Sequence, residues 1–393
     1  MNINNVLLNN VSRFSSKNNN GISFKSKNDK SLQQDVIEIS GKETNAKIFA
    51  KEIEDDAILQ IQKMCDMPVF KHAPIRIMPD VSVGRDCVVG FTVKLTPDKI
   101  KELPPSIIGN DIGCGVLMVK TNAKLDELDF EQLDKFIRSE LPTNKKLRPG
   151  MPIELQQDIK YSCDLYGSDS DKVFEQAGTL GNGNHFIELD VDEDKNVYLA
   201  IHTGSRQFGS YIKDYYEKLY KSGQTNNDDM NYAQAVAMAQ KYAKFNRESI
   251  AKMILEKLKL KPIMQFDCPH NYIADNGVVH KGSIDASLNQ PVLIPLNMRD
   301  GMILARGKGN EDWNCSAPHG SGRKMSRTDA RKVVDLNEYV DSMRGIYSSC
   351  VGRKSVDEAP QAYKDSNKTL DLVSQTVDIE NIIRPVYNFK NTR

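Results

Sequence analysis

The chain has 393 residues, which is enough for one large domain or two of ordinary size. Its 53 lysines and arginines balance 53 aspartates and glutamates, so a generic, globally basic nucleic-acid-binding protein is disfavoured, whereas an enzyme with a locally basic groove is not. No apolar stretch approaches the roughly 20 residues that span a bilayer, so we expect a soluble, cytoplasmic protein with no membrane partner. Seven scattered cysteines without a Cys-x-x-Cys pair argue against a zinc ribbon or a secreted disulfide framework.

The N-terminal segment differs in composition from the rest of the chain. Its first 28 residues contain several bases and many Asn and Ser but no acid. This composition predicts a flexible extension over residues 1–35, with a mitochondrial transit peptide as the alternative because such peptides are acid-poor and Ser-rich. Since no internal repeat or interdomain linker follows, residues 36–393 are expected to form one catalytic domain of mixed α/β type.

Four segments have patterns that predict regular structure. Residues 124–141 and 230–260 carry apolar residues at three- and four-residue spacing, which predicts amphipathic helices. Residues 197–204 and 290–298 are short apolar runs bounded by turn formers, which predict buried strands. The Gly-, Asn- and Pro-rich stretches between these segments hold the polar residues suited to metal and phosphate chemistry.

Two of these stretches precede the middle of the chain. In residues 107–116, Asp111 and Cys114 lie three apart among three glycines, and a thiolate beside a carboxylate is costly unless a cation shares them. The alternative is a tight turn with a buried, inert cysteine. In residues 178–189, a Gly/Asn loop could offer backbone N–H groups to a phosphate, and His185 and Glu188 follow it.

Three further histidines stand in comparable settings. His202 ends an apolar run. This position would suit either a metal ligand or a core histidine whose ring nitrogens have hydrogen-bond partners. His270 follows Cys268 and a proline, so only one of the two side chains is expected to bind a metal. His319 precedes a Gly-Ser-Gly run and Arg323, which predicts an accessible imidazole beside a phosphate cradle, acting as general base or as phosphorus nucleophile.

These histidines account for most of those in the chain. Of six in all, five lie in such segments when His280 is counted, and only His72 is left without a role. One Asp, one Cys and three His make a donor set large enough for two metal ions. Thiolate and imidazole donors by themselves would favour zinc.

Eight motifs together resemble those of the RtcB family of RNA-splicing ligases, in order and in spacing. They are MPDVSVGRDCVVGF, NDIGCG, GNGNHFIE, HTGSR, CPHNY, HGSGRKMSR, DEAPQAYKD and YNFKN, and the resemblance covers roughly Val36 to the C-terminus. It implies a single compact RtcB-type α/β domain with a central metal and nucleotide cleft.

The resemblance also implies the roles of individual residues. Cys114 would bridge two manganese ions, His202 and His270 would complete one site, and Asp111 with His185 the other. His319 would attack the α-phosphate of GTP and carry GMP. The predicted guanylate contacts are Asn184, His185, Phe186, Ile187, Glu188, His270, Asn271, Pro295, Leu296, Asn297, Met298, His319, Gly320, Ser321, Gly322, Tyr363 and Lys390.

The implied activity is ligation of RNA 2′,3′-cyclic phosphate or 3′-phosphate ends to 5′-hydroxyl ends, in RNA repair or tRNA splicing. GMP would pass from the histidine to the RNA 3′-phosphate, making an activated 3′-pp-G end. The family implies manganese in place of zinc, an archease-type activator as a possible partner, and a monomer.

Some positions depart from the family pattern. Ser82 replaces a usual histidine, Leu296 and Asn297 replace Gly-Ser, and Met302 replaces a guanylate-contacting serine. The altered turn resembles a compact subgroup associated with RNA repair. These departures affect the expected nucleotide contacts and leave the metal ligands and nucleophile intact.

Two other functions are considered. A metal-dependent cyclic phosphodiesterase without ligation would not need the HGSGR block, because hydrolysis requires no guanylate carrier. A non-catalytic RNA-binding paralogue would be favoured by loss of a ligand or of the nucleophile, and none is lost.

Overall fold

The structure is a computed structural model that describes residues 36–141, 150–223 and 230–392. The extension predicted over residues 1–35 lies outside the described residues. Both large sheets of the fold are discontinuous in sequence, so residues far apart in the chain become neighbours.

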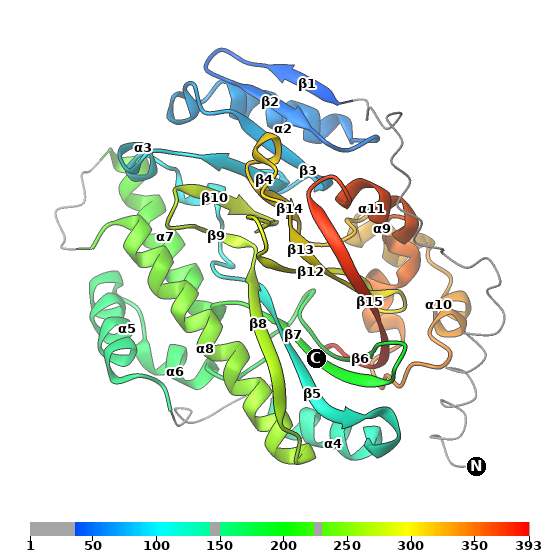
Figure 1. The fold of residues 1–393 in the computed structure, drawn as a ribbon. Coiled ribbons are helices and arrows are strands. Elements are labelled where there is room, and N and C mark those ends of the chain that lie inside the picture. Colours follow the sequence, from blue (N-terminus) through cyan, green and yellow to red (C-terminus); the bar gives the residue numbers. More distant parts are fainter. Residues whose placement is uncertain (1–35, 142–149, 224–229, 393) are drawn as a thin grey trace.

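The larger sheet has seven strands in the order β12-β13-β15-β6-β7-β5-β8, and every neighbouring pair is antiparallel. It curls into a half-barrel, with the long β15 crossing it (Figure 1). Its strands are β5 (Gly115–Lys124), β6 (Phe186–Val191), β7 (Asn196–Thr203), β8 (Pro262–Pro269), β12 (Pro291–Asn297), β13 (Gly301–Gly307) and β15 (Val377–Phe389).

The second sheet has the order β1-β2-β3-β4-β10-β9, and only its β2–β3 pair is parallel. A separate two-stranded ribbon pairs β11 with β14. These strands are β1 (Ile37–Ser40), β2 (Asn45–Ile48), β3 (Ile75–Ser82), β4 (Val89–Lys94), β9 (Asn271–Ile273), β10 (Val278–Lys281), β11 (Ser283–Asp285) and β14 (Ser316–Pro318). Because β9 follows β8 after one residue, the chain passes from one sheet to the other at His270.

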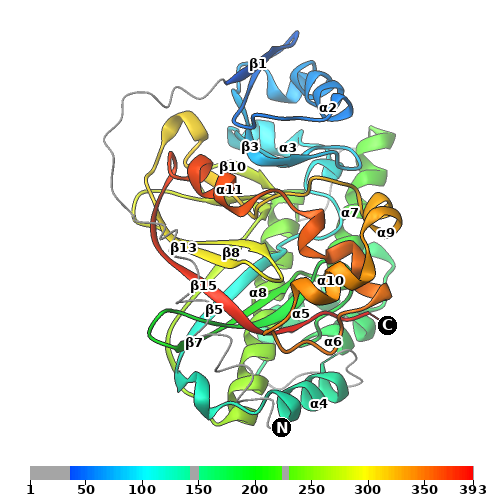
Figure 2. The same cartoon turned by 90° about the vertical axis from the view of Figure 1, so that its right-hand side faces the viewer.

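Helices flank the half-barrel on two sides. The group α5–α8 lies on one side, with α8 against β5 and β7, and α9–α11 lie on the other (Figures 1 and 2). The helices are α2 (Asp55–Cys65), α3 (Pro97–Lys101), α4 (Phe130–Glu140), α5 (Ile153–Tyr166), α6 (Ser170–Gln176), α7 (Arg206–Ser222), α8 (Tyr232–Leu258), α9 (Arg327–Val333), α10 (Leu336–Ser342) and α11 (Ser366–Val373). Among the described helices, none has the length and apolar character needed to cross a bilayer.

The expected mixed α/β class is confirmed, and the predicted elements are present with shifted ends. The helix predicted over 230–260 is α8, which starts after Asn231, whose side chain accepts from the Gln234 N–H. The helix predicted over 124–141 starts only at Phe130. Residues up to Lys124 continue strand β5, and the Asp129 side chain caps α4 by accepting from the Gln132 N–H. Local apolar spacing did not distinguish the strand end from the helix.

One buried arginine ties α8 to the sheet. Arg247 is 1% exposed and donates through Nε and Nη2 to the two carboxylate oxygens of Asp267, each at 2.6 Å. Its Nη1 donates to the carbonyls of Gly113 at 2.8 Å and Thr203 at 2.7 Å. Since these carbonyls adjoin Cys114 and His202 in the chain, Arg247 fixes the backbone that carries them.

Replacing this arginine should destabilise the fold. We expect Arg247→Met to lower the free energy of unfolding by about 3–5 kcal/mol, because the partly buried Asp267 carboxylate and the carbonyls of Gly113 and Thr203 all lose their buried donor. The matched control is Lys252→Met on the exposed side of α8, where the ion pair with Glu256 spans 3.9 Å and should contribute under about 1 kcal/mol. Guanidinium denaturation measures both, and equal losses for the two variants would contradict the role given to Arg247.

Candidate metal and nucleotide site

Four strand ends meet at one edge of the half-barrel. Cys114 directly precedes β5, His185 directly precedes β6, His202 is next to last in β7, and His270 directly follows β8. These strands are neighbours in the order β6-β7-β5-β8 and all run antiparallel, so the starts of two lie beside the ends of the others. The backbone N–H of His270 donates to the Cys114 carbonyl at 2.7 Å, which closes this edge.

The side chains at this edge form two groups that could each hold a metal ion. Cys114, His202 and His270 make one group, and Asp111, Cys114 and His185 the other, with ligand atoms within 4.8 Å of one another in each. Cys114 Sγ lies 3.2 Å from His202 Nε2 and 3.6 Å from His185 Nε2. Asp111 Oδ2 lies 3.0 Å from His185 Nε2. Cys114 therefore belongs to both groups.

The electrostatics of this cluster fit a divalent cation. Burial, followed by the charge of Asp111, raises the pKa of the Cys114 thiol well above its usual value. Burial also lowers the pKa of His202 and of His270 well below the usual value, which keeps both rings neutral as metal ligands require. Burial opposes ionisation of Asp111, but His185 lowers its pKa below the usual range. A bound cation would stabilise the thiolate that burial otherwise disfavours.

Hydrogen bonds orient the imidazoles toward the cluster. His185 Nδ1 lies 2.9 Å from the Leu180 carbonyl, which can only accept, so Nδ1 carries a proton and Nε2 is the ring nitrogen directed toward Cys114 and Asp111. Among the described residues, His270 Nδ1 is buried and has no hydrogen-bond partner. Buried polar atoms normally have a partner, so a bound cation would explain why this ring nitrogen has neither a donor nor an acceptor.

His319 comes from a different part of the fold and contacts the same cluster. It directly follows β14, and its ring centroid lies 4.7 Å from that of His270. Its Nδ1 lies 2.6 Å from Asp80 Oδ2, which also accepts from the His319 backbone N–H at 3.1 Å. Because this buried carboxylate is the acceptor, Nδ1 carries the ring proton and Nε2 is free to act as a nucleophile. The His319 side chain is 22% exposed, so a substrate can reach it.

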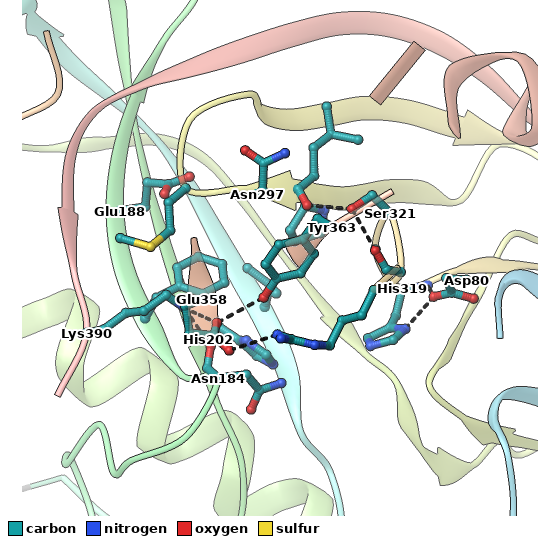
Figure 3. Close-up of a pocket in the computed structure, with 18 of the residues that line it drawn as sticks. Asp80, Asn184, Glu188, His202, Asn297, His319, Ser321, Glu358, Tyr363 and Lys390 are labelled. Atoms are coloured by element: carbon teal, nitrogen blue, oxygen red, sulfur yellow. Dashed lines mark hydrogen bonds and ion pairs between the residues drawn. The ribbon is translucent and has the colours of Figure 1, made fainter. Parts of the chain in front are cut away.

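A pocket opens beside His319 and is lined by most residues of the predicted guanylate set (Figure 3). Those that line it are Asn184, Phe186, Glu188, His270, Pro295, Leu296, Asn297, Met298, His319, Gly320, Ser321, Gly322, Tyr363 and Lys390. Three others of the set do not. His185 lies in the metal cluster, and Ile187 is buried in a core on the opposite face of β6. Asn271 donates to the Asp111 carbonyl and accepts from the Gly282 N–H.

Glu358 organises the far wall of the pocket, and sequence reasoning gave it no role. It accepts from Lys390 Nζ at 2.8 Å and from the Tyr363 hydroxyl at 2.9 Å, and it pairs with Arg327 at 2.6 Å and Arg323 at 3.4 Å. Burial opposes ionisation of Glu358, but Lys390 and Arg327 lower its pKa to about 2. The acid therefore stays ionised and holds three cations in place around the pocket.

Both Asp80 and Glu358 lie inside motifs that were quoted for the resemblance, MPDVSVGRDCVVGF and DEAPQAYKD. Their presence in blocks rich in functional residues was the available signal. Only the fold showed which partner each one contacts.

The structure accounts for two of the positions that depart from the family pattern, Asn297 and Met302. Asn297 Oδ1 accepts from the backbone N–H groups of Arg299 and Asp300, each at 3.0 Å, and its Nδ2 donates to Asp300 Oδ2 at 2.8 Å. Its amide therefore stabilises its own turn. Met302 is fully buried in a core cluster with Phe186, so it supports the pocket from behind. Ser82 lines the pocket.

Two residues from the sequence motifs lie outside the cluster. His280 is buried in β10, with its ring centroid 4.6 Å from that of Tyr272 and its Nδ1 3.0 Å from Ser283 Oγ. It is therefore a buried core histidine that packs on Tyr272 and has Ser283 as a hydrogen-bond partner. The Cys268 thiol is directed to the Pro291 carbonyl at 3.7 Å, so His270 is the member of this pair that joins the cluster.

Comparison with known proteins agrees with the motifs. Residues 60–391 match the family model described as tRNA-splicing ligase RtcB. The chain belongs to the RtcB family. It is 29% identical over 394 residues to the RNA-splicing ligase RtcB of Escherichia coli strain K12, covering 85% of this chain and 94% of that protein. It is 28% identical over 445 residues to the tRNA-splicing ligase RtcB of Nanoarchaeum equitans and 26% identical over 447 residues to that of Aeropyrum pernix, covering 86% of this chain and 92% of each relative. The resemblance inferred from the motifs is thereby confirmed.

Because Cys114 belongs to both ligand groups, the number of metal ions bound per chain tests whether two sites share its thiolate. We expect His185→Ala and His270→Ala each to lower the metal content by one divalent ion per chain, because each removes a ligand from one group only. Cys114→Ala should lower occupancy of both sites. Elemental analysis after equilibrium dialysis measures the content, with the buried Cys163→Ala as the matched control. Equal losses for all three cluster variants would contradict two sites that share one thiolate.

Proposed function

We propose that this RtcB-family chain is a GTP- and manganese-dependent RNA ligase that joins 2′,3′-cyclic phosphate or 3′-phosphate ends to 5′-hydroxyl ends, in RNA repair or tRNA splicing. The observation that carries the proposal is the position of His319. Its ring packs against His270 of the cluster able to hold two metal ions, and His319 also lines a pocket whose residues are suited to a nucleotide.

In this proposal the cluster would hold two manganese ions, with His202 and His270 as ligands of one, Asp111 and His185 as ligands of the other, and Cys114 available to both. Ions held there would polarise phosphoryl oxygens and balance the charge that develops during phosphoryl transfer. Arg323 and Arg327 line the same pocket and add fixed positive charge for the phosphates.

His319 is the nucleophile of the first step. Its Nε2 attacks the α-phosphorus of GTP, a P–N bond forms, and the bond to the leaving pyrophosphate breaks. The ring gains positive charge as this happens, and Asp80, which already accepts from Nδ1, stabilises that charge. Asp80 also fixes the ring so that Nε2 faces the incoming phosphorus.

The remaining steps transfer the GMP. A 2′,3′-cyclic phosphate is first hydrolysed to a 3′-phosphate. An oxygen of that phosphate attacks the phosphorus of the His319 adduct, and the P–N bond breaks as the 3′-pp-G end forms. The 5′-hydroxyl oxygen of the second RNA then attacks the RNA phosphorus, the hydroxyl loses its proton, and GMP leaves.

The part of the pocket lined by Glu188, Phe186 and Lys390 is suited to a guanine base. Glu188 can accept from the base N–H groups, and Lys390 can donate to its carbonyl oxygen. Lys390 Nζ is held in place by Glu358 at 2.8 Å and by the Asn184 carbonyl at 3.2 Å. Phe186 provides an aromatic wall, with its ring centroid 5.1 Å from Lys390 Nζ. An archease-type activator, a monomeric state and a cytoplasmic location remain predictions from the resemblance.

Guanylylation tests the nucleophile directly. After incubation with manganese and GTP labelled at the α-phosphate, the denatured protein should retain label, and His319→Ala should retain none because the P–N bond cannot form. The control is His72→Asn, an exposed histidine with a positive φ of 60° that asparagine tolerates. Absence of label in the unaltered protein with any divalent metal would contradict a guanylate carrier. Adding RNA with a cyclic phosphate and a 5′-hydroxyl would then separate ligation from hydrolysis alone.

Asp80→Asn tests the orientation of the nucleophile. The carboxamide cannot stabilise a positively charged ring and can present a donor toward Nδ1–H, so we expect the rate of guanylylation to fall by about a hundredfold or more. Metal content should be unchanged, because Asp80 belongs to neither ligand group. A normal single-turnover rate for Asp80→Asn would show that the contact has no role in the step.

A further inference from the structure

A second carboxyl group lies behind Glu188, and no step above uses it. Phe186, Glu188 and Asp190 alternate along β6 and so project from one face of the strand. The first two line the pocket, whereas Asp190 lies one position deeper and is completely buried. Around it the face is apolar, with a core cluster that includes Tyr198, its cross-strand partner on β7.

Asp190 has no donor to stabilise a negative charge. Among the described residues, neither of its carboxylate oxygens accepts a hydrogen bond from any donor, and it takes part in no ion pair. The hydroxyl of Tyr198 is used by Asp192 at 2.9 Å. Arg384 on β15 donates through Nη1 to the Asp300 carbonyl at 2.5 Å and acts on Asp190 only through its charge. An isolated ionised carboxylate in such surroundings would be very unfavourable.

The neighbouring acid on the same face of β6 is Glu188, two positions along the strand, and both side chains are buried. Each of these carboxyl groups affects the ionisation of the other. Two carboxyl groups can form a hydrogen bond only when one of them carries a proton. Glu188 has other partners that favour its charge. Its Oε2 accepts from Asn388 Nδ2, and Lys390 acts on it through its charge. Asp190 accepts no hydrogen bond among the described residues, and only the charge of Arg384 favours its ionised form, so the proton belongs on Asp190.

We propose that Asp190 is held as a neutral acid that donates its proton in a hydrogen bond to Glu188, so that the single negative charge of the pair stays at the pocket wall and selects a base with N–H donors, guanine over adenine. This inference rests on the proposed function for the identity of the base. Guanine offers two N–H donors on its pairing edge, whereas adenine offers a ring acceptor there, which an anionic Glu188 would reject. Asp190 is thus a positioning residue that acts through Glu188.

The titration behaviour of the pair is consistent with this assignment. Burial, then the charge of Glu188, raises the pKa of Asp190 well above the usual value. Burial raises the pKa of Glu188 to about 7, against the opposing effects of Asn388, Lys390 and the hydrogen bond from Asp190. Glu188 therefore loses its charge as the pH falls through about 7, and selective binding of guanine should weaken in the same range.

Two substitutions of Asp190 separate positioning from packing. In Asp190→Leu the donor is lost at similar volume, so Glu188 should hold its charge less well. We expect the Kd for GTP near neutral pH to rise about tenfold, the preference for GTP over ATP to fall by a similar factor, and the pH midpoint of GTP binding to move upward. In Asp190→Asn the carboxamide still donates, so it should restore most of the affinity and the original midpoint. Asp192→Asn, the next acid along the chain, is the control.

Infrared spectroscopy of the ligand-free protein tests the proton without any nucleotide. A carbonyl band of a neutral carboxylic acid should persist near neutral pH and disappear in Asp190→Asn. Absence of that band, or an unchanged pH midpoint in a folded Asp190→Leu protein, would overturn the inference. If the unaltered protein binds no GTP, the proposed function and the base selectivity both fail, and the infrared band alone then decides whether the carboxyl pair exists.

Discussion

The site depends on one constraint, the burial of the Cys114 thiol where four antiparallel strands end. The fold brings a thiol, three imidazoles and a carboxyl group to this point, and it provides few protein donors or charges to satisfy them. Desolvation lowers the pKa of His202 and of His270, which keeps these two rings neutral, and it raises the pKa of the Cys114 thiol. A pair of divalent cations shared by these residues would satisfy all five groups together, because it would stabilise the thiolate and accept the free lone pairs of the imidazoles.

Around this centre, each buried charge has a defined partner. Arg247 fixes the backbone beside Cys114 and His202 through Asp267 and two carbonyls. Asp80 fixes the ring of His319, and Glu358 holds the cations at the far wall of the pocket. Asp190 departs from this pattern, since among the described residues it forms no ion pair and accepts no hydrogen bond, and only the charge of Arg384 acts on it. Because of this exception we assign a proton to Asp190. The negative charge of the carboxyl pair then stays on Glu188, in the pocket wall that would contact the base.

Much of the site could be predicted from the sequence because its residues occur in short blocks of unusual composition. The blocks around Asp111, His185 and His319 each combine glycines with a ligand or nucleophile, and scarcity of histidine made each one informative. Pairings across the fold could not be obtained in this way. Asp80 and His319 are 239 positions apart, and the pairing of β15 with β6 brings Lys390 to the Asn184 carbonyl, 206 positions away in the chain. His280 has a functional-looking sequence setting, yet its stacking on Tyr272 makes it part of the core.

The central claim is that two manganese ions share the Cys114 thiolate next to His319. Anomalous diffraction from crystals grown with manganese tests it most directly, because the ions are located independently of any activity. The account predicts two anomalous peaks that flank the Cys114 sulfur, one beside His202 and His270 and the other beside Asp111 and His185. A single peak, or peaks with no bond to Cys114, would contradict it.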